Sequence, residues 1–405
     1  MTPNKNNILI VIMLLIASLT LTAQVKNSED YKNKSLTVEK RVSDLLNRMT
    51  LEEKILIIGG DEFATKPIPR LGIPALKMAD GPLGVRWGES NSYPSGIAMA
   101  STWNPELIGR VGEQIAIDTK VKGRDVILGP CVNIARVPMG GRNFESFGED
   151  PYLASRFAVS YIKGVQRKGV VATVKHYAVN NHEHERMYVD VQVDERTFNE
   201  IYFPAFRASV KEADVLAFMS AYNKVNGFYA SENGDLLLKK LKAEWGFGGL
   251  VMSDWGAVHS SIPTALNGLD LEMPNGRYLN IDSLMPAINS GVITQEILND
   301  KVRRILTVMI KVGLFDNPQP TKEKMDRPEV KEVAYKTAAE SIVLLKNTNN
   351  LLPLQTKNIK SIAVVGPNAV FTKTGGGGSS KVYPRYEAGP IDAIKKIVGK
   401  KVKVT

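Results

Sequence analysis

The sequence contains a single cysteine, Cys131, among 405 residues. One cysteine excludes an intramolecular disulfide, so the fold cannot depend on such a crosslink. The apolar neighbours Ile127, Leu128 and Val132 indicate a small buried side chain, because a nucleophilic cysteine needs an electropositive and partly exposed setting. We therefore expect Cys131 to be structural.

Long runs of one charge are also missing. The formal net charge is +10, but no run of Lys and Arg exceeds three residues, and acidic residues lie among the basic ones. Nucleic-acid-binding proteins usually gather their basic residues into a patch or stripe. With 43% hydrophobic and 23% charged residues, the composition is that of a globular protein with a large core, and we expect no nucleic-acid partner.

The apolar run near the N-terminus is too short for a comfortable membrane span. It covers ten residues, Ile8 to Ala17, whereas a spanning helix needs about 20. A short polar start with Lys5 precedes it and the small residue Ala23 follows, which is the layout of a secretory signal peptide. We expect residues 1–23 to be a signal peptide and the mature chain to be exported, periplasmic or extracellular, without stable membrane insertion. An uncleaved anchor is the alternative.

Several common catalytic motifs are absent. No Gly-x-Ser-x-Gly elbow occurs, which argues against a serine hydrolase. The segment 182–185 fails the zinc motif HExxH because Arg186 and Tyr188 stand where the second His is needed, so we expect no metal. The glycine-rich segment 375–381 fails the phosphate-loop motif at Ser380 and Val382, and it is either a loop facing the substrate or a linker.

Apolar strand-like runs alternate with helix-like stretches along the first 316 residues. This alternation is typical of a parallel sheet covered on both faces, either a barrel or an open doubly wound sheet. Most of these runs end in polar residues, and functional residues at the ends of several strands favour the (β/α)8 barrel. The predicted strands are 74–80, 126–133, 170–176, 215–222, 249–254 and 268–273, and the predicted helices include 105–122, 155–166, 194–213 and 233–244.

The remaining residues predict the beginning of a second α/β domain. We place the barrel at 35–316, a linker and the start of a connecting helix at 317–335, and the first part of an incomplete α/β sandwich at 336–405. Helices are expected at about 328–345 and 390–398, with a buried strand at 361–368 between them. Because 70 residues with one strand and one helix cannot bury a core of their own, we expect the chain to be part of a longer protein.

Asp254 is the candidate nucleophile. Taken alone, a Ser-Asp pair after a strand is more often a helix cap. However, glycoside hydrolysis needs a carboxylate nucleophile or base and a second carboxyl acid, together with many hydrogen-bonding partners for the sugar hydroxyls. The residue types suited to this second task occur at the predicted strand ends and in one loop, namely Asp80, Arg142, Lys175, His176 and Tyr222.

Six motifs occur in a fixed order along the chain, at 80–86, 129–136, 140–151, 175–177, 219–223 and 253–255. With these motifs the chain resembles glycoside hydrolase family 3, the β-glucosidase and β-xylosidase family, over residues 35–405. The resemblance implies a retaining exo-acting enzyme with a (β/α)8 barrel followed by an α/β sandwich, and no metal or organic cofactor. It implies that Asp254 is the nucleophile, that Asp80, Arg142, Lys175 and His176 grip the terminal sugar, and that Tyr222, Met219 and Trp255 lie beside it.

Two features depart from the family pattern or limit the match, one at the catalytic acid and one at His182, near the sugar. In glucosidase-like members the general acid/base is a Glu of the second domain, at a point that we expect to lie beyond Thr405, so this residue stays unassigned. His182 replaces a common Gln. Glu183 is a second local candidate for the acid, although an ion pair with Arg186 is its favoured role.

The leading prediction is a β-glucosidase acting on oligosaccharides or aryl glycosides. The alternatives are a β-xylosidase, a sugar-binding fragment without its acid, and an amino-sugar hydrolase that uses His182 or His184. The motifs do not distinguish glucose from xylose, and they set neither the linkage nor the oligomeric state.

Overall fold

The computed structural model describes residues 29–316 and 320–405. The predicted signal peptide, residues 1–23, lies outside the described residues. Within the described residues, no helix is long and apolar enough to cross a membrane.

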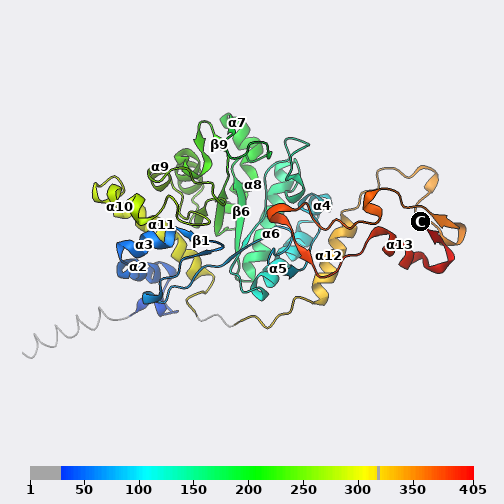
Figure 1. Ribbon diagram of the computed structural model, residues 1–405, viewed down its shortest axis with the longest axis horizontal. Coiled ribbons are helices and arrows are strands. Elements are labelled where there is room, and N and C mark those ends of the chain that lie inside the picture. The colour runs from blue at the N-terminus through cyan, green and yellow to red at the C-terminus, as the bar shows by residue number, and fades with distance from the viewer. Residues whose placement is uncertain (1–28, 317–319) are drawn as a thin grey trace, which may run out of the picture.

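A five-stranded parallel sheet forms the centre of the larger part of the chain (Figure 1). The side chains of all five strands are buried, which explains why the sequence shows apolar runs rather than alternation. In spatial order the strands are β11 (Leu250–Met252), β8 (Ala217–Ser220), β6 (Val171–Tyr177), β5 (Val126–Leu128) and β3 (Met78–Asp80).

Isolated bridges continue this sheet into a closed ring. Met252 pairs with Leu271, and Glu272 pairs with Gly59, both in the parallel sense. The hairpin of β1 (Gly60–Asp61) and β2 (Ala64–Thr65) follows, and an antiparallel bridge from Ala64 to Lys77 leads back to β3. The five strands, the 271–272 segment and the two hairpin strands make a closed ring of eight extended segments, so the predicted barrel is confirmed.

The ring departs from a regular (β/α)8 barrel at the hairpin. Only Glu62 and Phe63 connect β1 to β2, and such a short connection can join only antiparallel neighbours, because a parallel crossover needs a dozen or more residues. The strand expected at 268–273 is likewise reduced to the two bridges at Leu271 and Glu272.

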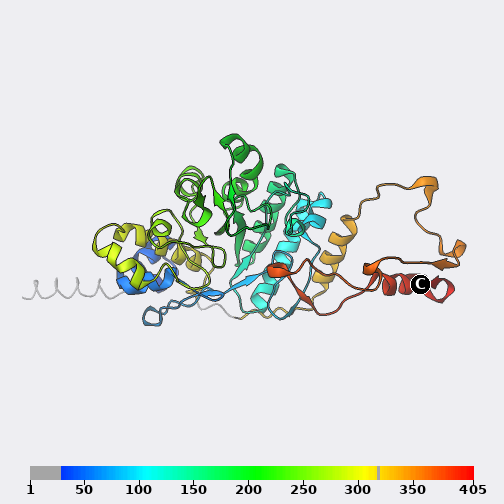
Figure 2. The same cartoon turned by 45° about the horizontal axis from the view of Figure 1, so that its top comes forward.

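Helices pack against one another around the ring (Figures 1 and 2). Asn104 and Asp150 cap the helices that begin at Pro105 and Pro151, where proline fits because the first helical N–H has no partner. The long helices are α2 (Val38–Arg48), α3 (Leu51–Ile58), α5 (Pro105–Val121), α6 (Pro151–Arg167), the π-helix η6 (Asp235–Glu244), α10 (Ile281–Asn289) and α11 (Gln295–Lys311).

One predicted helix is interrupted. The expected helix 194–213 consists of α7 (Glu195–Thr197), the π-helical turn η4 (Phe198–Tyr202) and α8 (Pro204–Lys211). Pro204 lacks a backbone N–H and cannot continue the α-helical hydrogen-bond ladder, so the helix breaks before it. The shorter elements of this part are α4 (Gly96–Ser101), α9 (Ile262–Leu266), β4 (Glu89–Ser90) and the small sheet of β7 (Asp190–Val191), β9 (Lys224–Val225) and β10 (Phe228–Tyr229).

Residues 320–405 form a second part that projects from the barrel (Figures 1 and 2). It contains α12 (Pro328–Glu340), the parallel pair of β12 (Ser361–Ile362) and β14 (Lys403–Val404), and α13 (Pro390–Val398). The helix α13 occupies the predicted range. Two other expectations are wrong: α12 ends at Glu340 rather than near 345, and the strand expected to be buried at 361–368 has only two residues, neither of them buried.

Two connections hold this second part to the barrel. Before α12, the buried Arg327 forms an ion pair with the fully buried Asp118 of α5 at 2.8 Å. Further on, β13 (Tyr383–Pro384) pairs with β4, and Ser92 donates a hydrogen bond to the Thr374 carbonyl oxygen. The segment 372–384, which we call the strap, therefore lies against the barrel.

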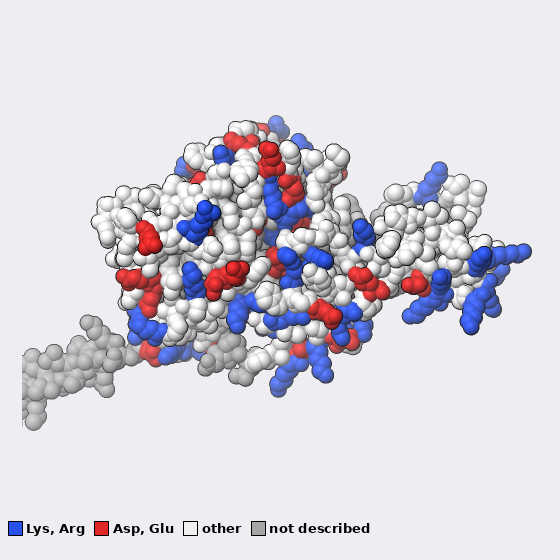
Figure 3. Space-filling view, viewed as in Figure 1, with Lys and Arg blue, Asp and Glu red and all other residues white. Residues whose placement is uncertain are grey.

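Surface charge is mixed on the face shown in Figure 3. Blue and red residues alternate over the barrel, in agreement with the interspersed charges of the sequence. Lysines gather near the projecting end, where Lys395, Lys396, Lys400 and Lys401 belong to α13 and the turn that follows it.

Candidate active site

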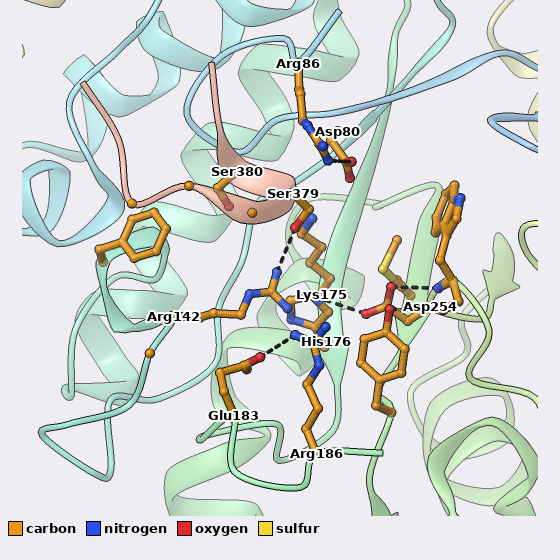
Figure 4. A pocket seen from close by; sticks show the side chains of 18 of the residues that line it. Asp80, Arg86, Arg142, Lys175, His176, Glu183, Arg186, Asp254, Ser379 and Ser380 are labelled. Carbon is orange, nitrogen blue, oxygen red and sulfur yellow. Dashed lines mark hydrogen bonds and ion pairs between the residues drawn. The ribbon is translucent and has the colours of Figure 1, made fainter. Parts of the chain in front are cut away.

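Asp254 lies at the end of β11 and does not cap a helix. The next helix, α9, begins at Ile262 after Ser261, so the common structural role of a Ser-Asp pair is excluded. The side chain is buried, and its Oδ1 accepts a hydrogen bond from the Trp255 N–H at 2.8 Å. One carboxylate oxygen is thereby oriented and Oδ2 remains directed to neighbouring side chains (Figure 4).

All the predicted site residues meet in one cavity of about 380 Å³. The carboxyl ends of the parallel strands lie at the same rim of the barrel. Residues at the ends of different strands therefore meet there. Figure 4 shows the side chains converging from several elements. The predicted residues that line the cavity are Asp80 of β3, Arg142 from the loop after β5, Lys175 and His176 of β6, Met219 of β8, Tyr222 after β8, and Asp254 and Trp255 after β11.

Asp80 is the second carboxylate of the cavity. Burial raises the pKa of Asp80 above its ordinary value, and the charge on Asp254 adds to this effect, while Lys175 and Arg86 oppose it. Arg86 Nη1 lies 3.2 Å from Asp80 Oδ2. The cations around Asp80 therefore support its ionised form, in which it can accept hydrogen bonds from two hydroxyls.

His176 faces Asp254, with its Nε2 3.6 Å from Asp254 Oδ2. This distance would allow an ion pair if the ring were protonated. However, burial lowers the pKa of His176 well below 6.5, and the charges of Arg142, Lys175 and Arg186 lower it further. We conclude that the imidazole is neutral at neutral pH and that its contact with Asp254 is not an ion pair.

Arg142 is held in place by Glu145, a buried carboxylate three residues further along the chain. Burial is the largest single influence and opposes the charge on Arg142, but Glu145, Cys131 and Asp254 together raise the pKa of the guanidinium. Glu145 also accepts a hydrogen bond from Ser380 of the strap, and Arg142 Nη2 lies 3.4 Å from Ser379 Oγ. The strap and the loop after β5 thus meet at one buried carboxylate.

The model for the glycosyl hydrolase family 3 N-terminal domain matches residues 40–308, and the model for the C-terminal domain of that family matches residues 342–404. The chain belongs to glycosyl hydrolase family 3.

Curated relatives and solved structures in this family are named as β-glucosidases. A β-glucosidase of Rhizobium radiobacter is 44% identical over 87% of this chain and 44% of its own length, and the thermostable β-glucosidase B of Acetivibrio thermocellus is 42% identical over 89% and 49%. The β-glucosidase 3B of Thermotoga neapolitana, solved with α-D-glucose, superposes with a TM-score of 0.84 at 37% identity over 90% of this chain and 55% of that one. The chain spans about half the length of these relatives.

The structure also places residues in the cavity that the sequence reasoning did not select. Arg86 and Arg186 are two further cationic side chains of the lining. The aromatic rings of Phe63 and Phe144 also line the cavity, and residues 376–380 of the strap form one side of it. Arg86 stands within the quoted family 3 motif 80–86, so that motif could have revealed it. Of the two readings left open for the glycine-rich segment, the loop that faces the cavity is the correct one.

Glu183 lines the cavity and forms an ion pair with Arg186, as expected. Its other oxygen accepts from Asn180 Nδ2 at 3.1 Å. Arg186 also lies over the ring of Tyr222, 4.6 Å from its centroid. The Tyr222 hydroxyl donates to the Trp255 carbonyl oxygen at 3.1 Å, and burial together with Asp254 raises the pKa of this phenol.

The remaining candidates lie outside the family 3 cavity. Cys131 is buried, and burial raises its thiol pKa to about 11, so it is not a reactive thiolate at neutral pH. Neither His182 nor His184 is among the residues that line the cavity, and His184 is exposed. Among the described residues, no group of three or more His, Cys, Asp or Glu side chains is arranged to hold a metal ion.

Proposed function

We propose that this protein is a retaining exo-β-glycosidase that removes terminal β-D-glucosyl residues from oligosaccharides. The observation that carries the proposal is the anchored carboxylate of Asp254 in a cavity that it shares with Asp80 and several cations. Ligand pockets of roughly 300–1,000 Å³ hold small molecules, and a cavity of about 380 Å³ suits a single sugar ring rather than an internal stretch of a polysaccharide.

In the proposed reaction, an oxygen of Asp254 attacks the anomeric carbon while the bond to the leaving oxygen breaks. The leaving oxygen takes a proton from an acid, and the sugar becomes an ester of Asp254. Water then attacks the same carbon, loses a proton to the conjugate base, and releases Asp254 and the sugar. Asp80 would accept hydrogen bonds from sugar hydroxyls, and Arg86, Arg142 and Lys175 would donate them.

Glucose is the favoured sugar because the relatives named above are β-glucosidases and one of them was solved with glucose. A β-xylosidase remains the alternative within the family. Competition between matched aryl β-glucosides and aryl β-xylosides measures the choice. A kcat/KM ratio in favour of the glucoside supports the proposal, and the reverse ratio assigns the xylosidase activity.

Trapping tests the nucleophile directly. A 2-fluoro glucoside with an activated leaving group should form a stable ester on Asp254, because the fluorine slows both steps and the leaving group rescues the first. Peptide mass spectrometry locates the label. A label on any other residue refutes the assignment.

Asp254→Asn is the complementary variant. We expect kcat/KM on an activated aryl glucoside to fall by roughly 10⁴-fold, since loss of a residue that makes and breaks bonds has an effect of this order. The melting temperature and glucose binding serve as controls for the fold. Activity within tenfold of the parent would contradict a nucleophilic role.

A second candidate function is sugar binding without efficient hydrolysis. Among the described residues that line the cavity, Glu183 is the third carboxylate, and it is engaged in an ion pair with Arg186. An aryl glucoside with an activated leaving group needs little acid assistance, whereas cellobiose needs it fully. Turnover of the first with strongly impaired turnover of the second indicates a nucleophile without its acid. Sugar binding with turnover of neither supports the binding function.

We also propose that the chain is exported after cleavage behind Ala23. The support is the ten-residue apolar run between a basic start and a small residue. Mass spectrometry of the secreted or periplasmic product should find an N-terminus at Gln24. A product that keeps residues 1–23 and sediments with membranes would instead indicate an anchor.

A further inference from the structure

Asn133 forms a hydrogen-bonded pair with His176, one of the residues that line the cavity. Both side chains are buried. Asn133 Nδ2 donates to the His176 carbonyl oxygen at 2.9 Å, and Asn133 Oδ1 accepts from the His176 backbone N–H at 2.9 Å. These two bonds fix the orientation of the amide, because exchanging its ends would set donor against donor and acceptor against acceptor.

The same amide oxygen determines where the imidazole proton sits. His176 Nδ1 lies 2.9 Å from Asn133 Oδ1. An amide oxygen can only accept, so Nδ1 must be the nitrogen that carries the proton. The other group near Nδ1 is the Cys131 thiol, whose Sγ is 3.8 Å away and which stays protonated because burial raises its pKa to about 11.

The opposite ring nitrogen faces the cavity. Nε2 lies 3.6 Å from Asp254 Oδ2, and with the proton on Nδ1 it could bear a second proton only as an imidazolium. Burial and the nearby charges of Arg142, Lys175 and Arg186 oppose that form. Nε2 therefore presents a lone pair on the side where Asp254 Oδ2, also an acceptor, lies.

We propose that Asn133 is a positioning residue that fixes the Nδ1–H tautomer of His176, so that Nε2 accepts a hydrogen bond from one hydroxyl of the bound sugar. The ligand part of this inference rests on the proposed function. The cationic side chains of the cavity can only donate, so they can hold a fluorine as well as a hydroxyl, although more weakly. His176 instead requires a true hydroxyl at the sugar position that it faces.

The tautomer can be measured by ¹⁵N NMR on the full chain, which contains four histidines. The signal of His176 is identified by its loss in His176→Gln. At pH 7 we expect a protonated Nδ1 and a bare Nε2. A protonated Nε2 overturns the proposal, and this spectrum of the unchanged protein decides the point even if variants of Asn133 fail to fold.

Asn133→Asp tests the role of the amide itself. A carboxylate beside Nδ1 favours the imidazolium, so both ring nitrogens of His176 should become protonated at pH 7 in this nearly isosteric variant. His259, half-buried and stacked on Tyr229, is the internal control and should keep its spectrum. An unchanged His176 signal in a folded Asn133→Asp protein would show that Asn133 does not set its protonation.

Calorimetric binding of glucose, its deoxy analogues and its deoxyfluoro analogues tests the acceptor. At the position that faces Nε2, both analogues should bind about tenfold more weakly than glucose, because fluorine cannot donate and one hydrogen bond to the site is lost. At positions held by cations, fluorine should retain part of the affinity. If fluorine is tolerated at every position, the acceptor role is wrong. If glucose itself does not bind, the proposed function fails while the NMR spectrum still decides the role of Asn133.

Discussion

The barrel, residues 29–316, buries most of its apolar side chains, whereas the projecting part, residues 320–405, leaves many of them exposed. Leu45 of α2 is fully buried in the barrel core, and so are the five central strands. In the projecting part, Ile342, Val343, Leu344 and Leu345 are 60–91% exposed in succession. Closure of the ring buries the apolar side chains of the central strands, whereas the described residues of the projecting part provide too few elements to cover many of their own.

The two parts nevertheless share the cavity. The barrel supplies the carboxylates and the four cationic side chains that line the cavity, while the strap supplies Gly376 to Ser380. The strap reaches the cavity because it is fixed on either side, by the strand pair β13–β4 and by the hydrogen bond from Ser92 to the Thr374 carbonyl oxygen, and between them Ser380 donates to the buried Glu145. The comparison teaches that a segment without much core of its own can still be positioned by a few buried polar contacts with a rigid neighbour.

Removing the buried ion pair should have the largest effect on how the two parts are joined. In Arg327→Met, Asp118 keeps Tyr93 and Asn91 as partners but loses its buried cation. An unpaired buried charge costs about 3–5 kcal/mol, and we expect the free energy of unfolding in urea to fall by this amount, with earlier proteolysis of residues 320–405.

The matched control is Arg110→Met. Arg110 joins the same helices, α5 and α12, through an exposed pair with Glu332 at 2.8 Å. Such pairs contribute under about 1 kcal/mol. Equal losses in the two variants would show that burial is not what makes the Arg327 contact important.

A pair of identical substitutions compares the two parts directly. Leu45→Ala opens a cavity in the barrel core and should lower the unfolding free energy by about 2–5 kcal/mol. Leu345, which is 91% exposed, should give a change within about 0.5 kcal/mol when replaced by alanine. Chemical denaturation measures both. A large loss for Leu345→Ala would mean that this side chain is covered in solution.

Displacing the strap should weaken sugar binding more than stability. A Cβ at Gly376 would lie 2.3 Å from the ring of Phe144, so Gly376→Ala must displace either the strap or the Phe144 ring, both of which line the cavity. We expect the Kd for glucose to rise about tenfold, the equivalent of one lost hydrogen bond. Gly375→Ala is the control, because its Cβ would meet only the Ser380 carbonyl oxygen at 4.0 Å. Similar affinities for the two variants would show that the strap does not contribute to binding.

One pH dependence of stability is expected to arise in the barrel, at a buried lysine of α11. Lys301 of α11 is buried and donates to the Leu269 carbonyl oxygen at 2.5 Å, and burial together with Lys242 lowers its pKa from 10.5 to about 7. Between these values the unfolded chain binds a proton that the folded chain does not, so this group makes stability rise with pH.

Lys301→Met should remove that contribution. Relative to the parent, the variant should show a smaller rise of unfolding free energy between pH 7 and 10.5 and no difference in slope below pH 6. Urea denaturation at several pH values provides the test. Parallel curves for the two proteins would mean that Lys301 is charged in the fold.

Much of the fold was predictable because it depends on local patterns. The apolar runs marked the five strands, Asn104–Pro105 marked the start of α5, and the range of α13 was correct, whereas α6 begins at Pro151 and not at the expected residue 155. The antiparallel hairpin strand was missed because two-residue strands carry too little periodicity. The end of α12 was missed because the sequence does not show whether the apolar residues 342–345 pack against another element, and in the structure they are exposed.

The residues of the candidate site were also predictable only where a local sequence pattern marks them. Asp80, Lys175, His176 and Asp254 could be selected because each follows or ends an apolar run. Glu145 and Ser380 could not, because their contact joins residues 235 positions apart in the sequence. Only the path of the strap reveals that a buried carboxylate connects it to Arg142.

The sequence by itself determined which residues carry charge and hydrogen-bonding capacity and that they stand at strand ends and in loops, since both are properties of the local chain. The tertiary structure decided that the barrel closes, that the strap returns to it, and that His176 is neutral with Asn133 behind it. These outcomes depend on burial and on distances between remote segments, because a pKa or a tautomer is set by whatever groups the fold places within a few ångströms.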